Sequence, residues 1–183
     1  LSGYLLLPGI IDLHGDGFER HLSPRPTAPF DKVKGLASVA GELTANGITT
    51  AWLAQSWSWE GGFRSGDAAV ALMEALDRAR GGVLADLRVQ LRLETHVIDQ
   101  HEAVLEAVAR HRVDFVVFNN HLPEAVEMAA TRPHRFASWA AQTSRTADEM
   151  LAIVRAAEAQ ETEVPAALTA IAGRFAALGV TMG

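Results

Sequence analysis

Apolar segments of strand length alternate along this chain with helical patterns, and this alternation constrains the fold more than any other feature. The apolar segments are nearly continuous in hydrophobicity, which is typical of strands buried on both faces of a parallel sheet. An order of strand, helix, strand, helix predicts an α/β fold with right-handed crossovers. The five predicted strands are Leu5–Leu13, Ile48–Ala54, Val89–Val97, Val113–Phe118 and Val180–Met182.

Boundary signals mark the helices between these strands. Gly47 follows an apolar helical pattern, at the position where a helix C-terminus favours glycine. Residues 122–165 contain no predicted strand, so we interpret them as a helical insertion within one domain that spans residues 1–183. The start signals are the N-cap residue Asp31, the capping-box pairs Asp99–Glu102 and Thr146–Glu149, and Pro165 in a first turn.

An open doubly wound sheet and a barrel both have this order of elements. No Gly-x-Gly-x-x-Gly follows the first strand, which argues against a dinucleotide-binding sheet. Five βα units are fewer than an eight-stranded barrel of ~250 residues needs, and the chain stops on a predicted strand. We therefore expect a partial (β/α)8 TIM-type barrel whose C-terminal part is missing.

The composition narrows the classes of partner and ligand. The sequence has no cysteine, so a metal ion would be held by His, Asp or Glu, and the chain suits a reducing cytoplasm. A formal net charge of -6 gives little attraction for nucleic acid. No apolar run reaches the ~20 residues of a membrane span, so we expect neither nucleic acid nor membrane as a partner. Self-association into a homo-oligomer is left open.

Candidate metal ligands follow three of the predicted strands. His14 and Asp16 follow the first strand, Glu94 lies in the third, and His121 follows the fourth. Because functional residues gather at the C-terminal ends of parallel strands, we expect these side chains at one rim. His14 and Asp16 are two apart on extended backbone and would point the same way. Imidazole and carboxylate groups from separate rigid elements predict a divalent metal site, in which the two oxygens of Glu94 can bridge two ions.

The same residues also have structural interpretations that the sequence leaves open. Glu94 could pair with Arg92 or Arg88, and His121 could cap the helix that follows it. His96 is interpreted either as a hydrogen-bond donor to one of the metal ligands or as a buried imidazole with its own hydrogen-bond partners. The remaining histidines in helical or loop patterns are expected to be solvated: His101, His111 and His134.

Two arginines lie in a proline-containing loop after the first strand. Arg20 and Arg25 fall within the stretch from Phe18 to Pro26. Guanidinium groups there could hold a phosphate by paired hydrogen bonds, although a surface loop with incidental charge explains them equally well. The tryptophans near the second strand are expected to serve packing rather than ligand stacking: Trp52, Trp57 and Trp59.

The stretch Leu7–Asp16, which reads LPGIIDLHGD, resembles the first-strand motif of the amidohydrolase superfamily. The chain is further similar to one of its families, the α-D-ribose 1-methylphosphonate 5-triphosphate diphosphatases of the carbon–phosphorus lyase pathway. That similarity runs along nearly all of the chain, although family members are about twice as long. It rests on Glu19–His21, Pro24–Pro26, Asn46–Thr50, Arg92–Glu94 and His121.

This resemblance implies a cytoplasmic, metal-dependent hydrolase of phosphonate metabolism. The family cleaves a ribosyl alkylphosphonate 5-triphosphate to the 5-phosphate and pyrophosphate. By this resemblance, one or two divalent ions, zinc first and otherwise nickel, manganese or iron, would activate water and offset charge on the leaving pyrophosphate. The implied ligands are His14, Asp16, Glu94 and His121, and the implied contacts to the small phosphorylated ribosyl-phosphonate substrate are Arg20 and Arg25.

The chain also departs from the family pattern. Asn120 stands where an aspartate is expected, and a later Ser-His-Asp-Asp stretch would fall beyond Gly183. The carboxylate of the last barrel strand is missing as well, so we expect the chain to be unable to complete catalysis alone. Two other interpretations stay open. One is another metal-dependent amidohydrolase, of the deacetylase or deaminase type, and the other is a catalytically incomplete fragment that binds a metal or phosphate.

Overall fold

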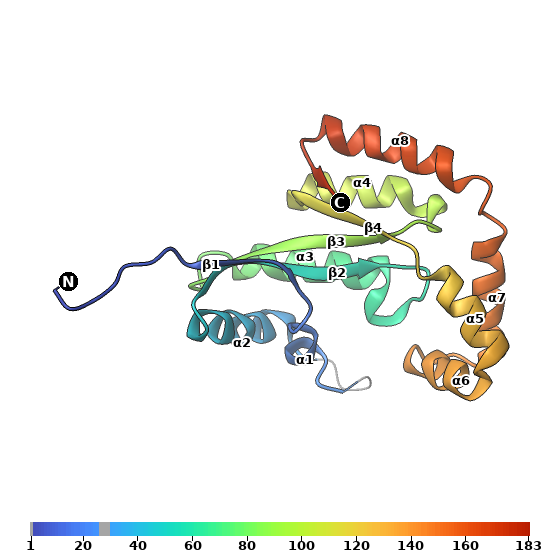
Figure 1. Ribbon diagram of the computed structural model, residues 1–183, viewed down its shortest axis with the longest axis horizontal. Helices are drawn as coiled ribbons and strands as arrows, with labels where there is room; N and C mark the ends of the chain where they lie inside the picture. The colour runs from blue at the N-terminus through green and yellow to red at the C-terminus, as the bar shows by residue number, and fades with distance from the viewer. Residues whose placement is uncertain (1, 26–29) are drawn as a thin grey trace. The chain divides into compact units, whose positions relative to one another are not determined.

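The computed structural model describes residues 2–25 and 30–183, and Figure 1 shows their strands and helices. The strands form one five-stranded sheet in the order β1-β2-β3-β4-β5, and β1–β2, β3–β4 and β4–β5 are parallel pairs. The predicted α/β class with a parallel sheet is thereby confirmed, while the superfamily stays a prediction. The strands are β1 (Ile10–Gly15), β2 (Ile48–Trp57), β3 (Asp86–Glu94), β4 (Phe115–Asn119) and β5 (Thr181–Met182).

Helices occupy every connection between consecutive strands. Two short 3-10 turns, η1 (Gly62–Arg64) and η2 (Ile98–Gln100), precede α3 and α4. The helices are α1 (Glu19–Leu22), α2 (Lys32–Ala45), α3 (Gly66–Ala79), α4 (His101–His111), α5 (Leu122–Thr131), α6 (Pro133–Gln142), α7 (Ala147–Glu158) and α8 (Val164–Ala177).

Contacts within the chain divide it into two compact units. The first comprises residues 1–54 and 75–88, and the second comprises residues 55–74 and 89–183. Strands β2 and β3 contribute residues to both units. Each unit is described below by itself.

In the first unit, β1 pairs with β2 and α1 packs against α2. The predicted cap of α2 is confirmed, because the Asp31 side chain accepts a hydrogen bond from the Lys34 backbone N–H at 2.9 Å. Gly47 ends the connection to β2 with a φ of 78°, which suits glycine. The buried face of α2 presents Leu36 and Val39 to the core of this unit.

The predicted first strand was wrong at its start and in its burial. Ile10 pairs with Ile48, the first residue of β2, so the residues before Ile10 have no neighbouring strand to bond. Leu5 is accordingly 91% exposed. Strand β1 also differs from the expected two-sided burial, because Ile10 and Leu13 are more than half exposed in the described part of the chain.

In the second unit, β3 presents two chemically different faces. Leu91 and Leu93 are fully buried, and their face carries the apolar side chains of β3. Phe118 of β4 contacts Phe175 of α8 with ring centroids 6.2 Å apart, which ties α8 to the strands. Helices α4 and α8 lie side by side (Figure 1).

The opposite face of β3 is polar. Gln90, Arg92 and Glu94 alternate with the leucines, so they share the other face of the strand. In the parallel register Glu94 lies opposite Asn119 of β4. With the Asn119 amide oriented so that its oxygen faces Arg92, that oxygen accepts bonds from Arg92 Nε and Nη2 at 3.1 and 2.8 Å. The polar face therefore leads to Glu94 at the C-terminal end of β3.

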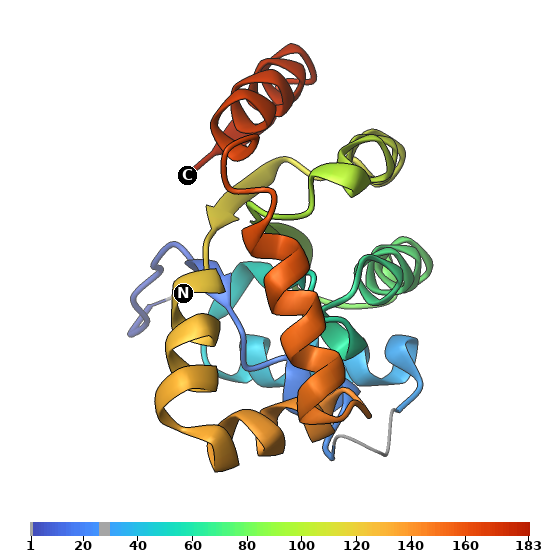
Figure 2. The ribbon, with the colours of Figure 1, turned by 90° about the vertical axis from the view of Figure 1, so that its right-hand side faces the viewer.

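Residues 122–165 contain helices and no strand, as the sequence predicts, and α5, α6 and α7 pack against one another (Figure 2). The capping box of α7 is confirmed, with Thr146 and Glu149 exchanging hydrogen bonds. Pro165 stands in the first turn of α8, also as predicted. The capping box at Asp99 was wrong: Asp99 lies inside η2, and α4 begins after Gln100 without a side-chain cap.

Candidate metal centre

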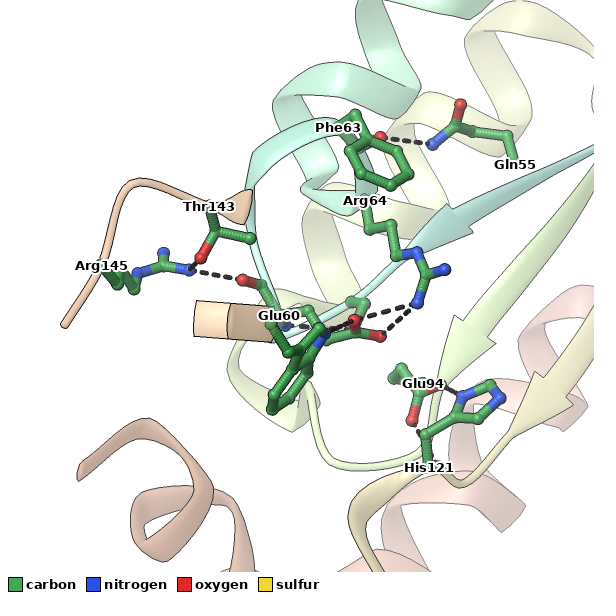
Figure 3. A network of polar contacts seen from close by, with 10 residues as sticks. Gln55, Glu60, Phe63, Arg64, Glu94, His121, Thr143 and Arg145 are labelled. Carbon is green, nitrogen blue, oxygen red and sulfur yellow. Dashed lines mark hydrogen bonds and ion pairs between the residues drawn. The ribbon is translucent and has the colours of Figure 1, made fainter. Parts of the chain in front are cut away.

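Glu94 is the last residue of β3 and one of the most buried charged residues of the described chain, at 2% exposure. Both of its carboxylate oxygens contact His121. The backbone N–H of His121 donates to Oε2 at 3.1 Å, and Nδ1 of the imidazole contacts Oε1. Figure 3 shows this pair at the ends of neighbouring strands. The sequence alternative in which Glu94 pairs with an arginine is not the arrangement observed.

His121 directly follows β4 and occupies the N-cap position of α5. Its side chain makes no capping hydrogen bond, so the capping interpretation holds for its position but not for its imidazole. Because Nδ1 is held by Glu94, the other ring nitrogen points away from that carboxylate (Figure 3). An ion that both residues bind would therefore replace the contact between Nδ1 and Oε1.

A second carboxylate, that of Glu60, lies in the loop after β2. Its side chain is 6% exposed and its oxygens are held by several donors. Arg64 Nη1 donates to Oε1 at 3.1 Å and to Oε2 at 2.9 Å, and the Ser58 hydroxyl donates to Oε1 at 3.3 Å. The Trp139 indole N–H donates to Oε2 at 3.3 Å. These bonds fix the carboxylate in one position.

Glu60, Glu94 and His121 converge. Each offers one ligand atom, and the three atoms lie within 4.8 Å of one another. Oxygen and nitrogen ligands bind zinc at ~2.1 Å, so the ligands of one ion lie up to ~4 Å apart. Small side-chain shifts would therefore bring these three onto one ion. Two buried carboxylates and an imidazole suit zinc, manganese and similar divalent ions, so the donor set fits the expected metal.

The remaining predicted ligands belong to the other unit. His14 and Asp16 are exposed, and the His14 backbone N–H donates to Asp12 Oδ1 at 3.0 Å. The structure therefore brings together Glu94 and His121 of the predicted set, with Glu60 added. A shared ion for all four predicted ligands stays a prediction.

The predicted phosphate contacts also lie in the first unit. The Arg20 guanidinium pairs with Glu42 of α2, and His21 Nε2 lies 2.7 Å from the other oxygen of that carboxylate. The hydrogen bond from His21 and the charge of Arg20 hold the pKa of Glu42 below its usual value. Arg25 is exposed, and the adjoining Pro26 of the predicted motif lies outside the described residues. A phosphate would have to compete with Glu42 for Arg20.

Sequence reasoning missed Glu60 and Arg64. It considered the end of the second strand only as far as Trp57, although Glu60 lies three residues beyond. The available signal was a glutamate and an arginine four residues apart directly after a strand, at the rim where ligands gather. That spacing is common on solvated surfaces, so the sequence alone gave little reason to select it.

The other histidines divide between two kinds of environment. His96 is 2% exposed, and its nitrogens bond Thr95 Oγ1 at 2.9 Å and Glu161 Oε2 at 2.7 Å, as a satisfied buried imidazole. His111 is 6% exposed, so the expectation that it is solvated was wrong; it lies at the end of α4 and turns toward the interior. His134 is exposed as expected.

Comparisons of the chain with models of protein families, with curated proteins and with solved structures found no match. Among the described residues, none of the helices combines the length and apolar character that crossing a bilayer requires.

Proposed function

We propose that this chain carries metal ligands of a metal-dependent hydrolase of the amidohydrolase type. The observation that supports the proposal most is the convergence of Glu60, Glu94 and His121 at the C-terminal ends of neighbouring strands. This is the rim at which enzymes with parallel βα units place their chemistry. A bound divalent ion would supply Lewis acidity and lower the pKa of a coordinated water.

The chain's own residues have distinct parts in this proposal. Glu94 and His121 would each bind the ion, and the contact between Oε1 and Nδ1 would be replaced by bonds to it. Glu60 supplies a second carboxylate, and Arg64 offsets its charge, so that two acidic groups can be buried close together.

The proposed substrate follows from the sequence resemblance. We propose a phosphoanhydride, specifically the 5-triphosphate of a ribosyl alkylphosphonate, cleaved to the 5-phosphate and pyrophosphate. The supporting residues are the Leu7–Asp16 motif and the later segments that resemble the diphosphatase family. A reaction in the cytoplasm, on a phosphorylated small molecule, belongs to the same proposal.

Two measurements on the purified chain test this function. Isothermal titration with zinc, manganese and nickel should show uptake of at least one of these ions, and uptake of none would contradict the metal centre. The metal-loaded chain is then assayed for pyrophosphate release from the ribosyl triphosphate and for deacetylation of a phosphorylated N-acetyl amino sugar. Pyrophosphate release supports the diphosphatase, and deacetylation would favour the other amidohydrolase. Metal uptake without turnover of either compound would favour the catalytically incomplete fragment, which is also what a chain unable to complete catalysis alone would give.

A further inference from the structure

Arg64 stands beside the two buried carboxylates with part of its guanidinium uncommitted. Its Nη1 makes both bonds to Glu60, at 3.1 and 2.9 Å. In the part of the chain that the structure describes, Nε and Nη2 make no hydrogen bond. A guanidinium carries five N–H donors, and three of them belong to these two nitrogens. The side chain is 37% exposed, so ligands from solvent can approach it.

Two other arginines of the chain use their Nε and Nη2 nitrogens to bind an oxygen acceptor. Arg88 directs Nε and Nη2 at Asp86 Oδ2, at 2.9 and 2.7 Å. Arg92 directs Nε and Nη2 at the Asn119 side-chain oxygen. Both arginines thus use the paired edge that suits planar oxygen acceptors. Arg64 keeps this edge unpaired and holds Glu60 with one nitrogen, an arrangement that neutralising Glu60 alone does not require.

The backbone around Arg64 is rigidly held. The Arg64 N–H donates to the Gly61 carbonyl at 3.1 Å, and the Arg64 carbonyl accepts from the Ser58 N–H at 2.8 Å. Gly61 and Gly62 have φ values of 77° and 59°, which let the chain turn this tightly. The Phe63 ring lies 5.4 Å from the guanidinium carbon. Since Glu60 and the Phe63 ring already hold the Arg64 side chain, it would lose little further entropy on binding a ligand.

We propose that Arg64 is the anion-binding residue of this site and binds a phosphate group of the substrate through its Nε–Nη2 edge. This inference rests on the proposed function and names the residue that would recognise a phosphate group of its substrate. Two carboxylates without a cation would repel a phosphate, whereas Arg64 and a bound metal ion offer it two positive partners. An arginine fork binds two phosphate oxygens at once, which selects phosphate over a neutral group.

The test uses the full chain loaded with manganese, with inorganic phosphate as the probe. Phosphate affinity is measured by isothermal titration, and metal content is measured before and after. Arg64→Lys retains a charge that can pair with Glu60 but lacks the fork. We expect it to bind manganese as the unchanged chain does and to bind phosphate about ten-fold more weakly, the usual effect of losing one charge-assisted hydrogen bond. Arg132→Ala, which removes an exposed arginine paired with Glu127, serves as the control and should change neither affinity.

The outcomes separate this inference from the proposed function. Failure of the unchanged chain to take up manganese would contradict the metal centre itself. Normal manganese uptake with equal phosphate affinity in the Arg64→Lys variant would overturn the role of Arg64 alone. Arg64→Ala removes the fork and the charge, and we expect it to weaken phosphate binding at least as much as Arg64→Lys does.

Discussion

His121 and Glu94 lie 27 residues apart in the chain, yet the carboxylate of Glu94 contacts both the backbone N–H and the imidazole Nδ1 of His121. The parallel register of β3 and β4 makes this contact possible, because it pairs Glu94 with Asn119, two residues before His121. One buried side chain thus positions the start of α5 and orients the histidine ring. Changes at Glu94 should therefore affect ligand binding directly.

Glu94→Gln keeps the shape of the side chain and an oxygen for the His121 N–H but removes the negative charge. We expect divalent-ion affinity to fall by about 10- to 100-fold, because an anionic ligand or its orienting bond is lost. Isothermal titration with zinc or manganese measures the change, and thermal melting monitored by circular dichroism checks the fold. Glu127→Gln, at an exposed glutamate, is the matched control. Unchanged metal affinity in Glu94→Gln would remove Glu94 from the site.

The sequence singled out two of the three residues that converge in this cluster. Glu94 and His121 could be selected because they lie at the ends of predicted strands, and the C-terminal ends of parallel strands share one rim. Glu60 could not be predicted in the same way. Its position depends on a turn through Gly61 and Gly62 and on a hydrogen bond from the indole N–H of Trp139, 79 residues away. Such long-range bonds leave no periodic signal in a single sequence.

Predictions of the helix and strand ends were likewise partly right and partly wrong. The caps at Asp31 and Thr146 depend on residues within a few positions, and both predictions were confirmed. The predicted start of β1 was wrong because a strand needs a neighbouring strand to pair with. Leu5 is apolar, as in a strand, but it has no neighbouring strand to pair with. Local cap patterns were thus right at Asp31 and Thr146 but wrong at Asp99, where a 3-10 turn precedes the helix.

Phe175 is the largest fully buried side chain of α8 and packs against Phe118 of β4. Phe175→Ala removes this contact and leaves a cavity, so we expect the free energy of unfolding to fall by about 3–5 kcal/mol. Urea unfolding followed by circular dichroism measures the change. The matched control is Phe30→Ala, because Phe30 is 49% exposed, and it should change stability by less than about 0.5 kcal/mol. Equal effects of the two substitutions would contradict the packing of α8.

The pKa of Glu149 depends on the capping box of α7. Hydrogen bonds from the Thr146 backbone N–H and then from its hydroxyl hold the pKa of Glu149 below its usual value of 4.5. Thr146→Ala removes the hydroxyl and loosens the first turn, so we expect the pKa of Glu149 to rise toward that value. An NMR titration of the Glu149 side-chain carboxyl measures it. A pKa that stays equally low would show that the Thr146 hydroxyl does not contribute to the lowering.

His101 begins α4 with its Nε2 buried and without a hydrogen-bond partner in the described chain. Burial lowers the pKa of His101 below its usual 6.5, and the nearby Asp99 and Glu102 oppose this effect only in part. Between the lowered pKa and 6.5 the unfolded chain binds more protons than the folded one. Stability from the neutral imidazole is therefore complete above pH 6.5 and declines as the pH falls from there toward the lowered pKa.

We expect His101→Gln to lose less stability than the unchanged chain when the pH is lowered from about 7.5 to about 5. Urea unfolding at several pH values in this range measures the difference. Glu42, Glu102 and Glu149 have pKa values lowered below 4.5, so their own losses of stability fall at more acidic pH and do not interfere. His134→Gln, at an exposed histidine, should leave the pH dependence as it is. If the free energy of unfolding falls equally with pH in His101→Gln and in the unchanged chain, then the lowered pKa of His101 does not account for the decline.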